Sequence, residues 1–586
     1  MSKKVEENLK SEEFWTLPKY KNKFGTDEYH EHLKKFLAKN DFEKLFRALK
    51  YSDILLKKSE KIKKTKNIIL ENCSSESCMV HKKRIKKFLK EKRRLNLVYS
   101  EIKKRVEKIH KKEIITFNIC NYVNKKLEEI NDKIVREGYT NEDLDNKDSL
   151  VLILTNFLKE KLKNEKILKY IENSNFNILA VGKDYSILED LYNFDYLTDI
   201  WKYSDLKIEN NYFKEIGEYG KKKIISQYLF LRKKEEKGKS VNYYEEFLLS
   251  QIKEYFYIES INQKYLDISL GYWIIAYLIL RIEVKKNQNK VNQYKSKEEM
   301  LKILIKSLSK ENIQEILNCI KKSEELFNSP IIVQIKELLS KPISREKAEI
   351  ILDKFIFTKD SKDLYDSPII EHEKGYIILP QIFLAIDFSR ALFSIISNSN
   401  KGNIEKKGDN LENTIKKIIE RVFSKFEHKK KGKFNGQKYE LDFIYKYKDE
   451  LIFLEIKTQK QPENYYDFYR SINDLNKYID KFNRNIEYYK NIDDSEKIFL
   501  KQDYKNTKKI FVSNVTYDLI FIEDVFIIDL DDFFKFFKEK DYNFSNLIEK
   551  KGQKILEIKS NISNRETIFS QEYNGIKGII NYCIKD

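Results

Sequence analysis

Two short runs of apolar and aromatic residues, separated by three polar residues, are the feature that most constrains the fold. Residues 440–447 (ELDFIYKY) and 451–458 (LIFLEIKT) flank the polar link 448–450 (KDE). Runs of this composition on either side of a short polar link predict a β-hairpin. Because successive side chains of a strand alternate between its faces, Glu455 and Lys457 are expected to share one face. The hairpin would thus present a carboxylate and an ammonium together.

The length of the turn decides whether Asp442 joins them. An even turn, for example Asp449 and Glu450, would put Asp442 directly across from Lys457. Glu455 would then be its diagonal neighbour, and such neighbours have Cβ atoms about 5 to 8 Å apart. An odd turn would send Asp442 to the opposite face. The meeting of the three side chains is therefore a conditional prediction.

Two carboxylates beside a lysine suit the hydrolysis of a phosphodiester with a divalent metal ion. Carboxylate oxygens are hard ligands for Mg²⁺ or Mn²⁺, and the ion polarises the phosphate and acidifies a bound water. Lys457 would position that water or neutralise developing charge. The alternative is that strand ends carry charged residues only because they are solvated, and a single Glu-x-Lys is common.

A helix is expected just before the hairpin, over residues 405–427. At about 100° per residue, Glu412 lies about 60° from the centre of the apolar face and Glu420 about 140° from it. Glu412 is therefore expected to lean toward the interior, while Glu420 faces solvent. The apolar residues at helical spacing are Leu411, Ile415, Ile418, Ile419, Val422, Phe423 and Phe426.

The order of these elements resembles the PD-(D/E)XK nuclease superfamily: a helix with a glutamate, a strand with an aspartate, a strand with Glu-x-Lys, a helix and a strand. The resemblance covers residues 401–535 and rests on GDNLE at 408–412, Asp442 in ELDFI, and EIK at 455–457. The proline that leads the superfamily signature is absent before Asp442, as it often is in members. The resemblance implies a restriction-endonuclease-like α/β domain, with a central mixed sheet flanked by helices.

The resemblance also implies roles for the matching residues. Asp442 and Glu455 would form a metal site, Lys457 would be the catalytic lysine, and Glu412 would be an auxiliary carboxylate near a second metal position. The implied cofactor is Mg²⁺ (or Mn²⁺). The implied activity is phosphodiester hydrolysis by an endonuclease, with DNA favoured over RNA.

The charge balance is that expected of a protein with a phosphate-bearing partner. Lys and Arg number 113 against 93 Asp and Glu, a net charge of +20. Such an excess favours nucleic-acid binding. The alternative is compositional, because an AT-rich genome raises the content of Lys, Asn and Ile everywhere.

Candidate nucleic-acid contacts lie in two parts of the chain. Residues 81–94 (HKKRIKKFLKEKRR) predict a basic amphipathic helix that could follow a phosphate backbone, with a merely solvated helix face as an equal alternative. Residues 465–489 predict a helix rich in Tyr and Lys, and Gln459 continues the face of Lys457 if the strand extends. The candidates are Lys82, Lys83, Arg84, Arg93, Arg94, Gln459, Tyr466, Arg470 and Lys477.

Only 15 Gly and 6 Pro interrupt the 586 residues, which favours long helices over a turn-rich β architecture. Short strands are expected at 355–358 and 376–379, and the best linker is 398–403 (NSNKGN). The expected regions are a mainly α-helical recognition or regulatory region of one or two subdomains at 1–345, a small α+β connecting segment at 346–400, the nuclease domain at 401–540 and a C-terminal extension at 541–586.

No apolar signal or membrane segment is expected. The longest charge-free apolar stretch, 268–280 (ISLGYWIIAYLIL), is too short to span a bilayer and predicts a buried helix. We therefore expect a cytoplasmic protein with no membrane partner. Five cysteines in so long a chain do not predict a disulfide framework, and Cys73 and Cys78 are expected to be reduced thiols.

Three hypotheses follow. The leading one is a metal-dependent nuclease whose helical region recognises a substrate, a partner protein or a trigger. Large recognition regions fused to compact nucleases occur in restriction and anti-phage systems, and by this analogy a defence role is expected. Cutting both strands would favour a homodimer. The alternatives are a nucleic-acid-binding protein in which the nuclease fold is architectural, and a helical scaffold for a protein partner.

Overall fold

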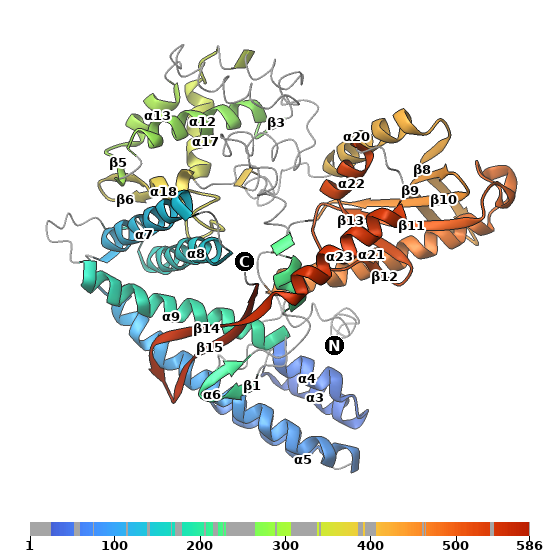
Figure 1. Ribbon diagram of the computed structural model, residues 1–586. Coiled ribbons are helices and arrows are strands. Elements are labelled where there is room, and N and C mark those ends of the chain that lie inside the picture. The colour runs from blue at the N-terminus through green and yellow to red at the C-terminus, as the bar shows by residue number, and fades with distance from the viewer. Residues whose placement is uncertain are drawn as a thin grey trace. The chain divides into compact units, whose positions relative to one another are not determined.

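The protein is described by a computed structural model (Figure 1). Its described residues belong to two compact units, each built from segments far apart in the sequence. Unit 1 draws on Met1–Lys111, Lys183–Gly220 and Asn564–Cys583, and unit 2 on Lys112–Gly182, Lys221–Ser563 and Ile584–Asp586. The described residues are 25–51, 59–73, 76–112, 115–137, 141–165, 167–169, 178–203, 207–214, 221–226, 228–229, 264–287, 290–305, 337–338, 341–384, 391–392, 406–459, 462, 465–538 and 544–584.

Unit 1 combines helices with a four-stranded sheet. Strand β2 pairs antiparallel with β1 and parallel with β15, in the order β1-β2-β15-β14. Its helices are α3 (Asp27–Ala38), α4 (Phe42–Tyr51), α5 (Ser59–Glu71), α6 (Glu76–His110) and α9 (Ile178–Tyr203). Its strands are β1 (Lys207–Glu209), β2 (Tyr212–Lys214), β14 (Ile562–Tyr573) and β15 (Ile576–Ile584).

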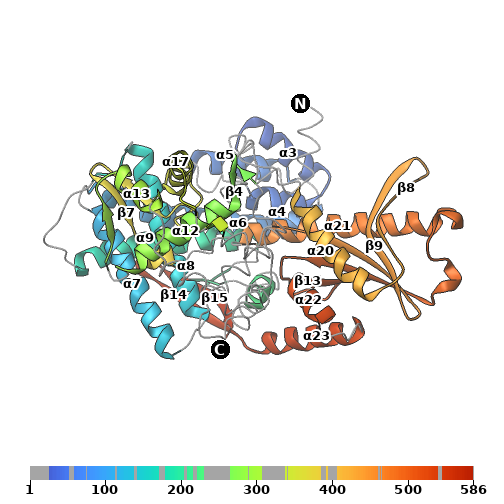
Figure 2. The ribbon, with the colours of Figure 1, turned by 90° about the horizontal axis from the view of Figure 1, so that it is seen from above.

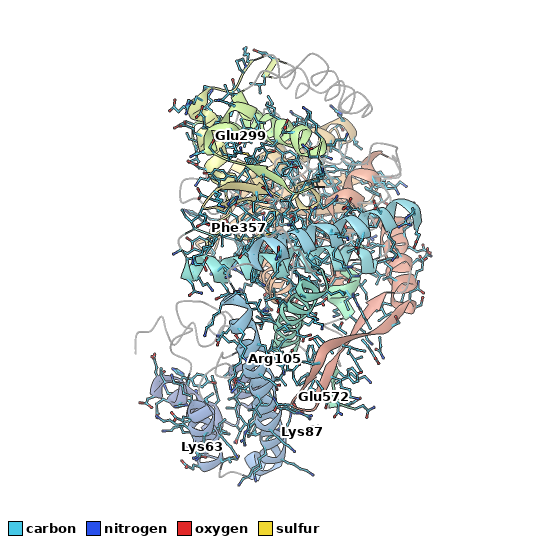
Figure 3. All side chains as sticks on the ribbon, turned by 90° about the vertical axis from the view of Figure 1, so that its left-hand side faces the viewer. Lys63, Lys87, Arg105, Glu299, Phe357 and Glu572 are labelled. Carbon is cyan, nitrogen blue, oxygen red and sulfur yellow. The ribbon has the colours of Figure 1, made fainter. Side chains whose placement is uncertain are left out.

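The β14–β15 hairpin is held against α9 and α6. Asn574 and Gly575 form its turn at φ 48° and 77°, the left-handed conformations that an Asn-Gly pair adopts readily. The buried carboxylate of Asp190 on α9 accepts hydrogen bonds from the amide of Ser570 at 2.7 Å and from the hydroxyl of Tyr573 at 2.6 Å. Figure 3 shows Arg105 on α6 and Glu572 on this hairpin, and the guanidinium of Arg105 lies 5.8 Å from the ring centre of Tyr573.

The prediction of reduced thiols at Cys73 and Cys78 is wrong at Cys73, and the side chain of Cys78 lies outside the described residues. Cys73, two residues after α5 ends, is disulfide-bonded rather than reduced. Cys120 is a free and fully buried thiol, and burial raises its pKa to about 12. It is therefore inert as a nucleophile at neutral pH.

The first part of unit 2 is helical and contains a small antiparallel sheet of order β5-β7-β6. Its helices are α7 (Ile115–Glu137), α8 (Asn141–Asn164), α12 (Leu270–Lys285), α13 (Lys297–Ile305), α17 (Arg345–Phe355) and α18 (Pro380–Leu384). Its strands are β3 (Lys264–Tyr265), β4 (Ile268–Ser269), β5 (Asn292–Tyr294), β6 (Ile369–His372) and β7 (Gly375–Ile378).

The apolar stretch 268–280 forms the core of this part. Most of it is α12, in which Trp273 and Tyr277 are fully buried, so the prediction of a buried helix is confirmed. Among the described helices, none is long and apolar enough to cross a bilayer.

The predicted strands between 346 and 400 are only partly correct. The strand expected at 376–379 corresponds to β7. The strand expected at 355–358 is reduced to a single bridge between Ile356 and Ile369, because α17 continues through Phe355. The linker predicted at 398–403 lies outside the described residues.

A six-stranded mixed sheet organises the remainder of unit 2, in the order β12-β13-β11-β10-β9-β8. Strands β8, β9 and β10 run antiparallel, whereas β10, β11 and β13 run parallel. The strands are β8 (Phe426–Phe434), β9 (Gln437–Tyr447), β10 (Glu450–Lys457), β11 (Asn506–Ser513), β12 (Phe521–Ile522) and β13 (Val525–Asp529). A mainly helical N-terminal region followed by a mixed sheet with helices confirms the coarse fold prediction.

Helices cover both faces of this sheet. Helices α20 (Lys406–Val422) and α22 (Leu530–Lys538) pack on one face, where Leu411, Ile415 and Phe533 meet Phe443, Leu454 and Val512. Helix α21 (Tyr465–Asn491) packs on the other, where its Tyr489 meets Phe453 edge to face. Helix α23 (Phe544–Ser560) follows. Adjacent residues of β10 thus serve opposite layers, as the strand period requires.

Strand β8 was not expected. The helix predicted to reach Glu427 ends at Val422, and Phe426 already pairs with Tyr445 of β9 (Figure 2). Phe426 continues the helical spacing of the preceding apolar residues, which misled the prediction. Asn435 and Gly436, at φ 49° and 79°, form the turn that returns β8 onto β9.

Candidate active site

The β9–β10 turn meets the condition that the sequence left open. It consists of Lys448 and Asp449, with Lys448 at φ 53°, and it joins the pair formed by Tyr447 and Glu450. A two-residue turn keeps Asp442 on the face of Glu455, as an even turn should. The turn lies one residue earlier than the example of Asp449 and Glu450.

This shift changes which residues stand opposite each other. The last registered pair is Leu454 with Phe443, so the next position places Asp442 across from Glu455. The expected partner, Lys457, is instead the diagonal neighbour. The two carboxylates are therefore brought closer than the sequence predicted.

The structure brings the three strand residues into contact. The ammonium of Lys457 lies 2.7 Å from Oε1 of Glu455 and 3.5 Å from Oδ2 of Asp442. The amide of Ile456 donates a hydrogen bond of 2.8 Å to the same Oδ2. Asp442 and Glu455 are only 5% and 4% exposed. A buried carboxylate pair is costly unless charge and hydrogen bonds compensate it.

The pKa values of Glu455 and Lys457 are shifted by this burial and by the neighbouring charges. Burial raises the pKa of Glu455 to about 7, and the neighbouring charge of Asp442 adds to the shift, while Lys457 and Lys481 oppose it. Burial lowers the pKa of Lys457, but attraction to Glu455 and Asp442 outweighs burial, and the pKa lies above its ordinary value. Lys457 therefore stays charged, and a further cation would favour ionised Glu455.

Glu412 lies on α20 and leans inward as predicted. Its side chain is 15% exposed, and Oε2 lies 3.0 Å from the ammonium of Lys429. Burial raises its pKa and the charge of Asp442 adds to this, whereas Lys429 and Lys457 lower it. Glu412 is thus within electrostatic range of the strand residues. Glu420 is exposed, also as predicted, and it pairs with Lys416 at 3.3 Å.

Lys429 is a site residue that the sequence reasoning missed. It lies on β8 between the registered pairs of His428 with Phe443 and of Lys430 with Leu441, which places it opposite Asp442. It sits inside a lysine run that shows no alternation of apolar and polar residues. The Asn-Gly turn at 435–436 is the one signal that would have revealed its strand.

The strand residues fit a divalent cation. Oε2 of Glu455 is buried and has no hydrogen-bond partner in the described part of the chain, which leaves a hard oxygen ligand available. Asp442 supplies a second one. Within the described residues, no group of three or more His, Cys, Asp or Glu side chains is gathered as a metal site.

Gln459 is held by its surroundings. Its backbone amide donates to Oδ1 of Asn514 at 2.6 Å, and its backbone carbonyl accepts from the side-chain amide of Asn514 at 2.6 Å. Oε1 accepts a hydrogen bond of 2.6 Å from Tyr517. Gln459 is thus fixed just past the end of β10, two residues from Lys457.

Helix α21 presents a basic stripe. The predicted contacts Arg470 and Lys477 are exposed and lie 3.9 and 3.4 Å from Asp474, while the side chain of Tyr466 lies outside the described residues. Lys481 on the same helix influences Glu455 electrostatically, although sequence reasoning did not name it. Four exposed cations fall within a sector of about 60°. This α21 stripe comprises Arg470, Lys477, Lys481 and Arg484.

The basic run of 81–94 lies in unit 1, on the long helix α6 (Figure 3). Its apolar side is buried, through Ile85, Phe88 and Leu89. Of the five candidates, Lys83, Arg84 and Arg93 are exposed, while Lys82 and Arg94 are half-buried. The guanidinium of Arg84 lies 4.7 Å from the ring centre of Phe46, and Arg94 donates to the carbonyl of Gly575 at 3.4 Å. Two of these side chains therefore also stabilise unit 1.

Comparison of the chain with protein-family models, with curated proteins and with solved structures yields no significant match in any of the three.

Proposed function

We propose that the chain is a metal-dependent nuclease of the PD-(D/E)XK type, which hydrolyses phosphodiester bonds. The observation that carries the proposal is the convergence of Asp442, Glu455 and Lys457. Their charged groups meet within 3.5 Å of the Lys457 ammonium, on buried carboxylates that have few other partners.

The connectivity of the sheet supports the same proposal. A helix with Glu412 precedes three antiparallel strands, the α21 crossover follows, and β11 then joins β10 in parallel. The resemblance implies this order for a restriction-endonuclease-like domain. We therefore assign that fold type to the six-stranded part of unit 2.

Each side chain has a role in the proposed reaction. Asp442 and Glu455 would hold Mg²⁺ or Mn²⁺, and the amide of Ile456 orients the Asp442 carboxylate. When bound, the ion polarises the phosphate and acidifies a water molecule. Lys457, fixed by both carboxylates, positions the attacking water and offsets charge that develops on the phosphate. Gln459, held by Tyr517, borders the same strand end.

Nucleic acid is the proposed polymer, with DNA favoured. The α21 stripe supports this choice, because its four exposed cations lie together along one side of the helix, beside Asp474. Phosphate backbones are bound chiefly by such clusters of Lys and Arg. The exposed basic residues of α6 are proposed as a second contact region.

The biological role follows only by analogy. We propose that the helical region recognises a substrate, a partner or a trigger, and that the nuclease serves restriction or anti-phage defence in the cytoplasm. Cutting of both strands of a duplex would favour a homodimer, which brings two active sites together.

A cleavage assay tests the proposal. The purified 586-residue chain is incubated with linear duplex DNA, single-stranded DNA and RNA, in Mg²⁺, Mn²⁺ or EDTA. We expect cutting in the metal ions only, and a loss of at least about 100-fold in Asp442→Asn and Lys457→Met. Glu440→Gln is the matched control, because Glu440 is an exposed carboxylate on the same strand that pairs with Lys431.

Two results would count against the proposal. Variants that cut as well as the parent would remove Asp442 and Lys457 from the chemistry. Salt-sensitive binding without cutting of any polymer would favour the architectural alternative.

A further inference from the structure

Glu412 pairs with its own lysine, unlike the two strand carboxylates. The ammonium of Lys429 lies 3.0 Å from Oε2 of Glu412, whereas Lys457 serves both Asp442 and Glu455. The side chains of Lys429 and Glu412 are 32% and 15% exposed. A partly buried pair of this kind is screened less by salt than a fully exposed one.

The backbone of Lys429 is unusual for a residue inside a strand. Its φ is 53°, a left-handed conformation that costs a non-glycine residue about 1 to 2 kcal/mol. Asn435 and Lys448 share this conformation, but both form two-residue turns in which it is required. Lys429 has no turn to form, since β8 continues to Phe434. The strain coincides with the position opposite Asp442, and strained residues cluster at functional sites.

The charges of these five side chains limit how many divalent cations the site can hold. When ionised, Glu412, Asp442 and Glu455 carry three negative charges against two positive charges on Lys429 and Lys457. One divalent cation turns the surplus of one negative charge into one positive charge. A second would leave three positive charges in a largely buried site, with an ammonium already in contact with Glu412.

We propose that Lys429 supplies, as a fixed ammonium, the positive charge that a second divalent cation would otherwise bring to Glu412, so that the site binds a single ion at Asp442 and Glu455. Lys429 acts through Glu412 and is a positioning residue. The inference rests on the proposed function, because it presumes the metal site at Asp442 and Glu455. It departs from the second metal position that the resemblance implies for Glu412.

The test counts ions and needs no cleavage. Mn²⁺ binding to the 586-residue chain is measured from the signal of the free ion in electron paramagnetic resonance. We expect one ion per parent chain and two per Lys429→Met chain, the second lost again when Glu412→Gln is added. Lys429→Gly is the companion variant, because glycine adopts φ 53° without strain and also removes the ammonium. We expect it to bind two ions as well.

Lys431→Met is the matched control. It removes a lysine from the same strand, but Lys431 forms an exposed ion pair with Glu440 at 3.2 Å, with side chains 66% and 45% exposed. This variant should still bind one ion. Lys429→Arg, which keeps the charge, should do the same.

The outcomes separate the two proposals. Two ions bound by the parent, or one ion bound by both Lys429→Met and Lys429→Gly, would overturn the role of Lys429 while leaving the nuclease proposal intact. No ion bound by the parent, or binding unaffected by Asp442→Asn, would overturn the metal site itself and the inference with it.

Discussion

Asp442 and Ile456 are joined across the β9–β10 hairpin, where the amide of Ile456 donates a hydrogen bond of 2.8 Å to Oδ2 of Asp442. The bond uses a backbone group that does not change with the side chain, and it fixes one oxygen of the carboxylate toward Lys457. A substitution at Asp442 that retains an acceptor therefore separates the role of its charge from its role in the hairpin.

Asp442→Asn should fold like the parent, but Mn²⁺ should no longer stabilise it against unfolding. An amide oxygen can still accept from Ile456, and one of two buried negative charges is removed, so the melting temperature in EDTA should stay near that of the parent. Mn²⁺ at about 100 times its dissociation constant should stabilise the parent by about 2.7 kcal/mol and the variant by far less. Thermal unfolding with and without Mn²⁺ measures this. Equal stabilisation of both proteins would place the ion elsewhere.

Stability in EDTA should decline as the pH rises from about 4.5 to 7. The pKa of Glu455 is raised from 4.5 to about 7 by burial and by Asp442, so in this range the folded state binds more protons than the unfolded state. Each pKa unit corresponds to about 1.4 kcal/mol, and the contribution present below pH 4.5 is lost as Glu455 ionises near pH 7. Urea unfolding across this range, compared with Glu455→Gln, tests the sign. The decline should be shallower in the variant, and an identical profile would contradict the assignment.

Neutralising the two C-terminal cations of the α21 stripe should weaken nucleic-acid binding and reduce its salt dependence. Lys481→Gln with Arg484→Gln removes two exposed cations, so the slope of log K against log salt should fall by about one to two units. Lys490→Gln is the control, because Lys490 lies about 150° from the centre of the stripe on the same helix and pairs with Glu487. Fluorescence anisotropy over a salt series measures both. A slope unchanged in the double variant would remove α21 from the interface.

Gly432→Ala should destabilise unit 2. A Cβ atom at Gly432 would lie 2.5 Å from the hydroxyl oxygen and 2.6 Å from ring carbons of Tyr439, its buried partner across β8 and β9. Overpacking of this kind costs about 1 to 3 kcal/mol. Chemical denaturation gives the loss directly. Tyr439→Ala should make the same glycine substitution nearly neutral, and a full cost in that background would show that the ring is not the cause.

Much of the site could be predicted because strands and helices have fixed periods. The period of two places Glu455 and Lys457 on one face, and the helical period turns Glu412 inward. The register could not be predicted as closely, since Lys448 takes φ 53° at the turn without any glycine or asparagine to mark it. The result is a shift of one residue that changes the direct partner of Asp442 from Lys457 to Glu455.

What escaped prediction depends on contacts distant in sequence. Strand β8 has a polar, lysine-rich sequence, and its conformation is set by pairing with β9 rather than by its own pattern. The sheet of unit 1 depends even more on distant contacts, because β2 pairs with β15, which lies near the other end of the chain. No local pattern in residues 207–214 or 576–584 indicates that pairing.

The parallel pairing of β2 with β15 also affects how the protein is made. Tyr212 pairs with Gly578, which is translated 366 residues later. At about 5 to 20 residues per second, this interval lasts about 20 to 70 s. During this time the ribosome completes the six-stranded sheet of unit 2, while β2 keeps an unpaired edge. The nascent chain thus finishes its proposed catalytic part before its N-terminal unit, which leaves that edge open to chaperones and to mispairing between neighbouring chains on a polysome.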